Sequence, residues 1–329
     1  MINRIKLYES NSFDPYRNLA TEQYLMETVE EDACILFLWQ NQNTVVIGKN
    51  QNAWKECRTA LLQEEGGFLA RRLSGGGAVF HDLGNLNFTF LLPQAAYDLD
   101  RQFSVIAEAV SLLGLRSERS GRNDVLAEGR KFSGNAFYKH NGKAYHHGTL
   151  LISADMDKLG RYLNPSKAKL QAKGVASVRS RVVNLTELNP HITVDSMKRA
   201  MAQAFARVYA APMTVMTDGD LDHAAIEALR QRNAGWDWNY GQKLPFTAEL
   251  EARFPWGGMQ LCLQVENGAI VSAKVYSDAM DWRLPQRLEA ILPGLPLQKE
   301  AVCTAIDGLQ ADWARDVAQW LRDQWAALL

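Results

Sequence analysis

The residues best suited to chemistry lie in one run in the first third of the chain, where two arginines precede three consecutive glycines. The run reads Arg71-Arg72-Leu73-Ser74-Gly75-Gly76-Gly77-Ala78-Val79-Phe80-His81-Asp82. Glycine has no Cβ, so a fold keeps several together where the backbone takes positive φ or approaches another group closely. Free amides in such a loop can bind an anion, and two guanidinium groups add opposite charge. A plain glycine turn between strands explains the three glycines alone about equally well.

Three further segments carry polar groups that could join this site. Asn123 and Asp124 offer the oxygens that Mg²⁺ prefers beside phosphates, although an Asx turn is favoured slightly by their spacing alone. Lys131 lies in an apolar strand, where it either meets an anion or lies exposed at a sheet edge. The adjacent histidines His146 and His147 point to opposite faces of a strand, which argues against a shared metal and leaves one of them for a pocket.

Composition and missing motifs exclude several function classes. The 329 residues carry a formal net charge of −1 with 47% hydrophobic residues, so nothing points to nucleic acid. The chain has no GxxxxGK[ST], GxGxxG or GxSxG motif. Its four cysteines form no CxxC pair, which argues against a zinc knuckle and favours a reduced, cytoplasmic setting. We expect no membrane partner, because no apolar stretch is long enough to be a signal peptide or a bilayer span.

The elements that must position these residues alternate irregularly between short strands and helices. This order predicts an α+β fold rather than a doubly wound one. We expect helices over residues 16–28, 54–64, 102–113, 155–162 and 193–209, the last capped by Thr193. Strands are expected at residues 34–39 and 44–47 as one hairpin, at 67–73 and 78–80 around the glycines, at 85–92, at 124–127 and 131–138 as a second hairpin with a tight turn, and at 144–153.

A smaller domain is predicted after a change in composition near Pro245. Residues 237–245 have the composition of a linker, and we expect a helix after them. Two strands, 259–266 and 270–277, then flank Asn267-Gly268, which is a strong hairpin signal. The remaining residues predict helices, the last held to the small domain by Trp313, Trp320 and Trp325. The predicted domains are therefore residues 1–244 and residues 245–329.

Taken together, these motifs resemble the lipoate-protein ligase A family of bacteria. The glycine run carries the resemblance, with the segments 121–124, 130–134 and 146–150. Residues 44–52 and 164–185 add to it, and all six segments occur in the family's order. The resemblance implies a large domain of mixed β-sheets with packed helices, as in biotin and lipoate ligases, and a small α+β C-terminal domain. It covers nearly the whole chain.

The function that the resemblance implies is a two-step, ATP-dependent ligation. Lipoate and ATP would give lipoyl-AMP and pyrophosphate, with Mg²⁺ as the metal ion. The lipoyl group would then pass to a lysine of an acceptor, either a lipoyl domain of a 2-oxoacid dehydrogenase E2 subunit or the glycine cleavage H protein. A monomer is the simplest state for such an enzyme.

The resemblance also assigns roles to individual residues. Lys131 would be the catalytic residue, stabilising charge as the mixed anhydride forms. Substrate and ATP would be bound by Arg71, Arg72, Ser74, Gly75, Gly76, Gly77, Ala78, Val79, Phe80, Lys131 and His147, with Val46, Leu19 and His81 along the lipoyl tail. The metal would be held by Asn85, Asn123 and Asp124. A loop over residues 167–181, with Lys173, Ser177, Val178, Arg179 and Arg181, would close over the adenylate and exclude water.

Two other functions are less consistent with the sequence. An octanoyl- or lipoyl-transferase of the same superfamily works through a cysteine thioester, but no cysteine here lies beside the pocket motifs. A non-catalytic regulator that binds an adenylate would call for a basic face and a helix-turn-helix segment, which the net charge of −1 does not favour.

Overall fold

The largest element of the fold is an eight-stranded mixed sheet. The structure, a computed structural model, describes residues 2–121, 123–164, 181–240 and 248–325. Within them the strand order is β11-β1-β2-β6-β10-β9-β8-β7, with β1 parallel to β2 and β11 and the other neighbours antiparallel. The bounds are β1 (Arg4–Glu9), β2 (Ala33–Trp39), β6 (Asn85–Pro93), β7 (Glu118–Ser120), β8 (Asp124–Ala127), β9 (Arg130–His140), β10 (Lys143–Leu151) and β11 (Met213–Val215).

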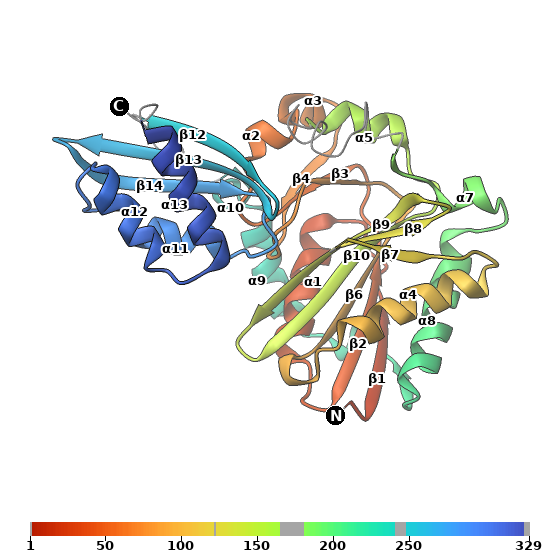
Figure 1. The fold of residues 1–329 in the computed structure, drawn as a ribbon. Coiled ribbons are helices and arrows are strands. Elements are labelled where there is room, and N and C mark those ends of the chain that lie inside the picture. Colours follow the sequence, from red (N-terminus) through yellow and green to blue (C-terminus); the bar gives the residue numbers. More distant parts are fainter. Residues whose placement is uncertain (1, 122, 165–180, 241–247, 326–329) are drawn as a thin grey trace.

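Helices cover both faces of this sheet (Figure 1). Helices α4 (Leu99–Leu112) and α8 (Val194–Tyr209) pack on one face, and α1 (Pro15–Thr28) and α9 (His223–Ala234) on the other. Because side chains alternate along a strand, the wholly buried β2 sends Leu36 to the first core and Phe37 to the second. Thr193 caps α8 as predicted, accepting from the amide of Ser196.

A second sheet carries the glycine loop, and here one predicted hairpin is wrong. The strand order is β4-β3-β5, with bounds β3 (Thr44–Ile47), β4 (Phe68–Arg71) and β5 (Val79–His81). Residues 34–39 and 44–47 were expected to pair, but β2 already pairs with β1 and β6 on both of its edges. The chain therefore leaves the large sheet, and β3 joins β4 and β5 instead.

The C-terminal part folds around its own apolar core (Figure 1, blue). Its sheet is β12 (Ala248–Phe254), β13 (Gly257–Glu266) and β14 (Ala269–Ser277), covered by α11 (Leu284–Ile291), α12 (Lys299–Asp307) and α13 (Asp312–Gln324). The predicted Asn267-Gly268 turn is confirmed, and Trp313, Trp320 and Trp325 join this core. The helix expected after Pro245 is wrong: in β12 half-buried and exposed side chains alternate with a period of two, which makes a strand.

The remaining helices are short. They are α2 (Ala53–Glu56), α3 (Thr59–Glu64), α5 (Met156–Tyr162), α7 (Leu185–Leu188), α10 (Trp236–Tyr240) and the 3₁₀ turns η1 (Gln94–Ala96) and η3 (Asp218–Asp220). Among them, α2, α3, α5 and α10 lie around the second sheet. The single helix expected over residues 54–64 is two, because Cys57 forms a bridge with Leu163 between them. Residues 237–240 of the expected linker are helical. The boundary at residue 244 stays a prediction, since residues 241–247 lie outside the described residues.

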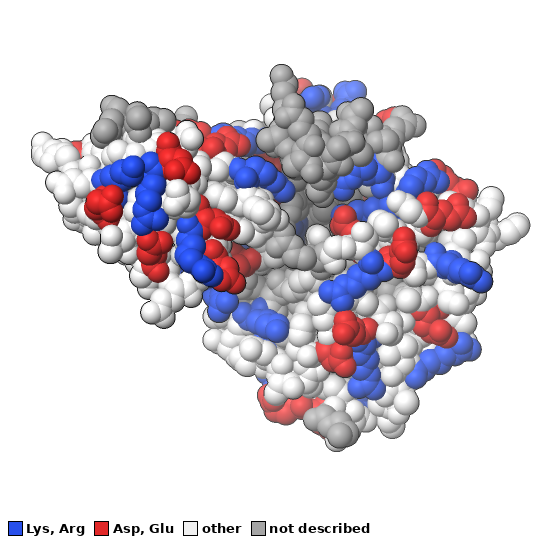
Figure 2. Space-filling view, in the orientation of Figure 1, with Lys and Arg blue, Asp and Glu red and all other residues white. Residues whose placement is uncertain are grey.

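The observed class confirms the α+β prediction for both parts of the chain. The hairpin of β8 and β9 is confirmed with its tight turn, in which Glu128 and Gly129 both take positive φ. Among the helices that the structure describes, none combines the length and apolar character that a bilayer crossing requires. In Figure 2 positive and negative side chains are interspersed over the face drawn.

Candidate functional site

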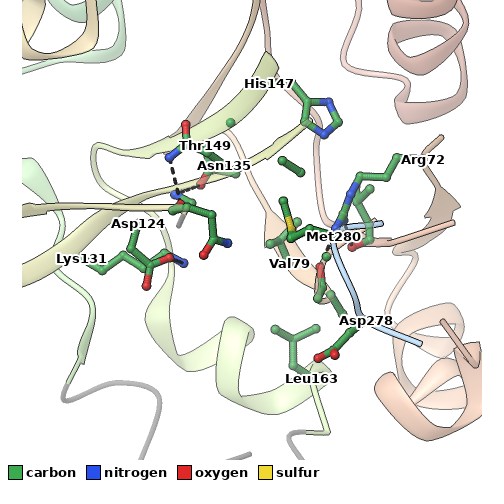
Figure 3. A pocket seen from close by; sticks show the side chains of 18 of the residues that line it. Arg72, Val79, Asp124, Lys131, Asn135, His147, Thr149, Leu163, Asp278 and Met280 are labelled. Carbon is green, nitrogen blue, oxygen red and sulfur yellow. Dashed lines mark hydrogen bonds and ion pairs between the residues drawn. The ribbon is translucent and has the colours of Figure 1, made fainter. Parts of the chain in front are cut away.

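One pocket gathers most of the predicted site residues. It has a volume of about 480 Å³ and lies between the glycine loop, the strands β9 and β10, and a loop of the C-terminal part at residues 278–280. Lys131 and Asp124 lie on one side of it, and Arg72 and Met280 on the other (Figure 3). The predicted site residues that line it are Arg72, Gly76, Gly77, Ala78, Val79, Asn123, Asp124, Lys131, His147 and Arg181, with Leu19, Val46 and His81.

Arg72 holds the glycine loop from inside. Its guanidinium donates to the carbonyl oxygens of Gly75 and Gly77, both at 2.8 Å, and to Ser74 Oγ at 3.0 Å. Burial lowers the pKa of Arg72 to about 10, so the group keeps its charge at neutral pH. Gly76 has φ +88°, and a Cβ there would lie 3.1 Å from Arg72 Nη2. The loop therefore turns its carbonyls toward the arginine, and the charge lies directly behind it.

Arg71, predicted to bind substrate, is a structural residue instead. Arg71 ends β4 and points to the side opposite Arg72, the next residue, so its guanidinium leaves the pocket and donates to backbone carbonyls. The acceptors are Gly48, Lys49 and Gln51 in the turn after β3, and Trp238 and Asn239 in α10. Arg71 thus joins β4 to two other segments of backbone and does not line the pocket.

Three more predicted binding residues do not line the pocket, each for its own reason. Phe80 follows the pocket residue Val79 in β5, so it faces the opposite side and packs on Tyr162 with ring centroids 5.4 Å apart. Ser74 is wholly buried beneath the loop. Gly75 lies against the C-terminal part, where a Cβ would come within 2.2 Å of the Ala279 carbonyl oxygen.

Lys131 forms an ion pair at one wall of the pocket. Its Nζ lies 2.6 Å from Asp124 Oδ1, and the lysine side chain keeps 24% of its surface exposed. The path of the side chain needs Gly134, since a Cβ there would lie 2.8 Å from Lys131 Nζ. Arg181 Nη2 lies 4.0 Å from the other Asp124 oxygen, because Val182 pairs with Lys131 at the edge of β9. Two cations and one carboxylate thus meet where the resemblance places the reaction.

Asn123 and Asp124 provide oxygen donors at the pocket, and Asn85 does not. Asn85 is buried and donates to Asn87 Oδ1 at 3.0 Å; of the two, Asn87 lines the pocket. Of the adenylate-loop residues, Lys173, Ser177, Val178 and Arg179 lie outside the described residues. Arg181 alone of that set is described, and it lines the pocket.

His147 belongs to a buried network that the sequence analysis missed. Its Nδ1 lies 2.8 Å from Glu22 Oε1 and its Nε2 lies 2.8 Å from Ser74 Oγ. The hydroxyl of Thr89 donates to the same Glu22 oxygen and accepts from the indole N–H of Trp39. Glu22 could have been found: it lies three residues from both Leu19 and Leu25 on the buried face of α1, where a carboxylate is unusual.

The C-terminal part also contributes residues that sequence reasoning did not identify. Arg253, Trp256, Asp278 and Met280 line the pocket (Figure 3 draws the last two). Asp278 accepts from Arg253 Nη1 at 2.8 Å and from the amide of Gly258 at 2.6 Å. Nothing in their local sequence marks these residues, because they reach the pocket only when the two parts pack together.

Two protein families match this chain, in the order of its two parts. Residues 14–206 match the lipoyl protein ligase A/B catalytic domain, and residues 243–319 match the bacterial lipoate protein ligase C-terminus. A lipoate-protein ligase A of Psychrobacter cryohalolentis is 40% identical over 332 residues, covering 97% of this chain and 98% of that protein. One of Blochmanniella pennsylvanica is 39% identical over 334 residues, covering 96% and 98%.

Solved structures agree with these sequence matches. The P. falciparum protein LipL1, in complex with lipoate, is similar with a TM-score of 0.86 and 29% identity, covering 97% of this chain and 99% of that one. A lipoate-protein ligase A bound with ATP gives 0.61 and 25%, covering 73% and 99%. A bi-partite lipoate protein ligase of Thermoplasma acidophilum, described with its E2 lipoyl domain, gives 0.62 and 25%, covering 75% and 100%.

Proposed function

This chain belongs to the lipoate-protein ligase A family, and from that premise we propose a two-step mechanism centred on Lys131. The protein is an ATP-dependent lipoate–protein ligase. The observation that carries the mechanism is the position of Lys131, which lies on one wall of the pocket while Arg72 and the glycine loop form another. One lysine can therefore contact both the acid that is activated and the phosphate that is attacked.

In the first step a carboxylate oxygen of lipoate attacks the α-phosphorus of ATP. The bond from this phosphorus to the β-phosphate oxygen breaks, and pyrophosphate leaves as lipoyl-AMP forms. Lys131 would donate to the lipoate carboxylate and to an α-phosphate oxygen, which lowers the repulsion between two anions. Lysine suits this task, because its ammonium is a compact point charge with three donors.

The phosphates would lie against the glycine loop. Arg72 binds the carbonyls of Gly75 and Gly77 from behind the loop, so its charge favours an anion at the amides of Gly77 and Ala78. The apolar part of lipoate would lie along Leu19, Val46 and Trp39, which line the same pocket. In the structure bound with ATP and the structure in complex with lipoate, similar folds hold these two ligands.

The residues at the pocket fit Mg²⁺ through oxygen donors. Among the described residues no group of three histidine, cysteine or acidic side chains is arranged to hold a metal ion alone. Mg²⁺ typically takes one or two carboxylates and completes its shell with substrate phosphates and water. Asn123 and Asp124 would hold it, with Lys131 released from Asp124 when the phosphates arrive. When bound, the ion supplies charge neutralisation on the phosphates.

In the second step the adenylate passes its acyl group to an acceptor. The neutral ε-amine of an acceptor lysine attacks the lipoyl carbonyl carbon, the carbon–oxygen bond to AMP breaks, and the amine loses one proton. We propose lipoyl domains of E2 subunits and the glycine cleavage H protein as acceptors; the Thermoplasma ligase described with its E2 lipoyl domain supports the first. Arg181, at the pocket beside Asp124, would help keep water from the adenylate.

A monomeric, cytoplasmic enzyme is the simplest setting for this reaction. All four cysteines are free and buried, which is typical of a reducing compartment. The cysteine-dependent transferase is the weaker alternative. None of the four cysteines lines the pocket, and burial raises the pKa of Cys34 and Cys57 to about 12, so neither is a ready nucleophile.

The experiment that tests the function is pyrophosphate release from ATP and Mg²⁺, with and without lipoate, in the absence of any acceptor. Release that depends on lipoate supports the adenylation step. If lipoate has no effect, and the acyl group instead passes to the acceptor from an acyl-carrier thioester, the protein is a transferase and the proposed ATP role of the glycine loop is wrong.

The variant Lys131→Ala tests the central residue. We expect lipoate-dependent pyrophosphate release to fall at least about 100-fold, the effect of removing one key charge-stabilising donor. Thermal unfolding should change little, because the side chain is partly exposed and pairs at the pocket edge. Lys139→Ala, which removes an exposed lysine from the same strand, is the matched control and should keep full activity. An active Lys131→Ala variant would contradict the mechanism.

A further inference from the structure

A buried histidine that the mechanism does not use lies directly behind the pocket. His146 precedes His147 in β10 and points to the opposite face of the sheet, where it has no exposed surface. Four phenylalanine rings surround it at centroid distances of 4.9–5.8 Å, namely Phe88, Phe90, Phe103 and Phe137. Both nitrogens of an imidazole in such a core need hydrogen-bond partners, so the two partners show which nitrogen carries the proton.

One of these bonds connects the core to the pocket. His146 Nε2 lies 2.8 Å from Oδ1 of Asn135, a residue that lines the pocket from β9. Asn135 Nδ2 in turn donates to the backbone carbonyl of Asn123 at 3.1 Å. Since that carbonyl can only accept, the amide oxygen of Asn135 must face the histidine, and Nε2 must carry the proton.

The other imidazole nitrogen is fixed by the same logic. With Nε2 protonated and the ring neutral, Nδ1 needs a donor, and the atom of Gln102 that contacts it is the amide oxygen Oε1, at 3.1 Å. Among the described residues Gln102 Nε2 has no hydrogen-bond partner, and a 180° rotation of this amide, which exchanges Oε1 and Nε2, would let it donate to Nδ1. Burial also keeps the pKa of His146 well below its usual value, in agreement with a neutral ring.

Asn135 forms two hydrogen bonds to the segment that bears the proposed metal ligands. The carbonyl of Asn123 accepts twice from Asn135, from its backbone amide at 2.8 Å and from its side chain at 3.1 Å. Asp124 follows immediately and pairs with Lys131 at 2.6 Å. A rotation of the Asn135 side chain would therefore remove one of the two hydrogen bonds that Asn135 donates to the carbonyl of Asn123, directly before Asp124.

The backbone of β10 leaves room for this connection. Gly148 lies opposite Asn135 in the ladder of β9 and β10. A Cβ at position 148 would come within 2.7 Å of Asn135 Oδ1 and 2.6 Å of the Phe88 ring. Because Gly148 has no side chain, Asn135 can reach His146. The glycine of the segment 146–150 is therefore part of the same hydrogen-bonded arrangement as His146 and Asn135.

We propose that His146 is a positioning residue for Mg²⁺–ATP: through Asn135 it fixes the carbonyl of Asn123 and so the two oxygen ligands at residues 123 and 124. The inference rests on the proposed function, because it gives those two residues the metal and the phosphates. It assigns no contact between His146 and any substrate. Loss of the histidine should weaken nucleotide binding and leave the lipoate end of the pocket unchanged.

The test compares three variants by calorimetric titration of ATP with Mg²⁺ in the absence of lipoate, so that no turnover occurs. His146→Leu removes the donor, and we expect ATP with Mg²⁺ to bind about tenfold more weakly or worse, as for other residues that orient metal ligands. His146→Gln can place its amide N–H near the position of Nε2 and should recover most of the affinity. Phe103→Leu loosens the same core but keeps every hydrogen bond, and should bind like the native protein.

Kinetics and spectroscopy separate positioning from mere stability. In pyrophosphate release, His146→Leu should raise the KM for ATP while the KM for lipoate stays within about twofold. The ¹⁵N shifts of the native imidazole should show the neutral tautomer protonated at Nε2, a measurement that needs no variant to fold. A proton at Nδ1, equal affinities in His146→Leu and Phe103→Leu, or a parallel rise in both KM values would each overturn the proposal.

The two levels of inference fail in different ways. If the native protein releases no pyrophosphate in response to lipoate, the proposed function is wrong. If it does so normally, and His146→Leu nevertheless binds ATP with Mg²⁺ as tightly as the native protein, only the role of His146 is wrong.

Discussion

At the scale of single residues, the site depends on a glycine that leaves room for a neighbouring side chain as much as on charged groups. Lys131 reaches Asp124 only because Gly134 has no side chain. Arg72 keeps its charge although it is buried, because loop carbonyls accept its hydrogen bonds. Of these two positions, Gly134 is the one that we expect to be changeable with little effect on the fold and a large effect on chemistry.

Gly134→Ala is a direct test of this separation. The new Cβ would lie 2.8 Å from Lys131 Nζ, the mobile end of a flexible chain, so the lysine moves rather than the backbone. We expect adenylation to fall about tenfold or more, while the free energy of unfolding changes by less than about 1 kcal/mol. Gly160→Ala in α5 is the control, since a Cβ there meets nothing within 4 Å and helix propensity favours alanine. Full activity in Gly134→Ala would show that the position of Lys131 is not critical.

Buried histidines predict how stability depends on pH. Burial lowers the pKa of His81 to about 3, so the folded protein leaves this ring neutral, while the unfolded chain protonates it below about pH 6.5. The free energy of unfolding should therefore be highest above pH 6.5 and fall toward pH 3, by up to about 1.4 kcal/mol per unit from this group.

Urea unfolding at about pH 7, 6 and 5 measures this slope. His81→Gln should flatten it, and His191→Gln, at an exposed position, should leave it as in the native protein. A slope that His81→Gln does not change would mean that the ring titrates alike in the folded and unfolded states.

At the scale of elements, alternation along short strands decides which of two neighbours serves the pocket. Arg71 and Arg72 are adjacent in sequence, but only Arg72 lines the pocket. Arg71 instead ties the turn after β3 to α10 through backbone carbonyls. Val79 and Phe80 divide in the same way in β5.

The two arginines should therefore differ when each is replaced by methionine. Both variants leave buried carbonyls without a donor, and each should lose about 3 kcal/mol of unfolding free energy in urea. In the fraction of protein that stays folded, Arg71→Met should keep a KM for ATP within about threefold of the native value. Arg72→Met should raise this KM about tenfold or more. Equal changes of the KM for ATP in the two variants would show that Arg71 contributes to ATP binding as much as Arg72 does.

At the scale of the whole molecule, the pocket is completed by the packing of its two parts. The amide of Ser277 donates to the carbonyl of Asn50, and Asn50 Nδ2 donates to the carbonyl of Trp282 at 2.6 Å. The Trp282 ring lies 5.1 Å from Tyr138, with Lys49 Nζ 4.7 Å from its centroid. These contacts hold Met280 at the glycine loop, where its sulfur comes within 3.4 Å of the Cβ position of Gly76.

Trp282→Ala should loosen this packing without unfolding either part. We expect the interface to lose about 1–2 kcal/mol, because the aromatic and cation–π contacts disappear. Differential scanning calorimetry should then show the C-terminal part unfolding at a lower temperature than the rest of the protein. Saturating ATP should raise this transition temperature less than it does in the native protein. Lys55→Ala removes exposed ion pairs to Glu249 and Glu251 and is the control, worth less than about 1 kcal/mol. Identical thermograms for both variants would show that Trp282 does not hold the interface.

The sequence by itself determined the class of fold and most elements, and it singled out residues that the proposed reaction uses. Helix caps, two-residue turns and apolar periods are local signals, so α8, the β8–β9 hairpin and the Asn267-Gly268 turn could be predicted from their own residues. Lys131, Asp124 and the glycine run stood out for the same reason: charge or glycine is costly in an apolar strand unless it has a use.

Only the tertiary structure decided which of these residues meet. The partner of β3 depended on β2 having both edges occupied, and the direction of Arg71 depended on where β4 lies in its sheet. Asn135 and Met280 line the pocket from segments far apart in the chain, and Glu22 contacts the pocket residue His147 from a third. Contacts of this kind arise from long-range packing, which fixes side-chain directions through neighbours that no local window of sequence contains.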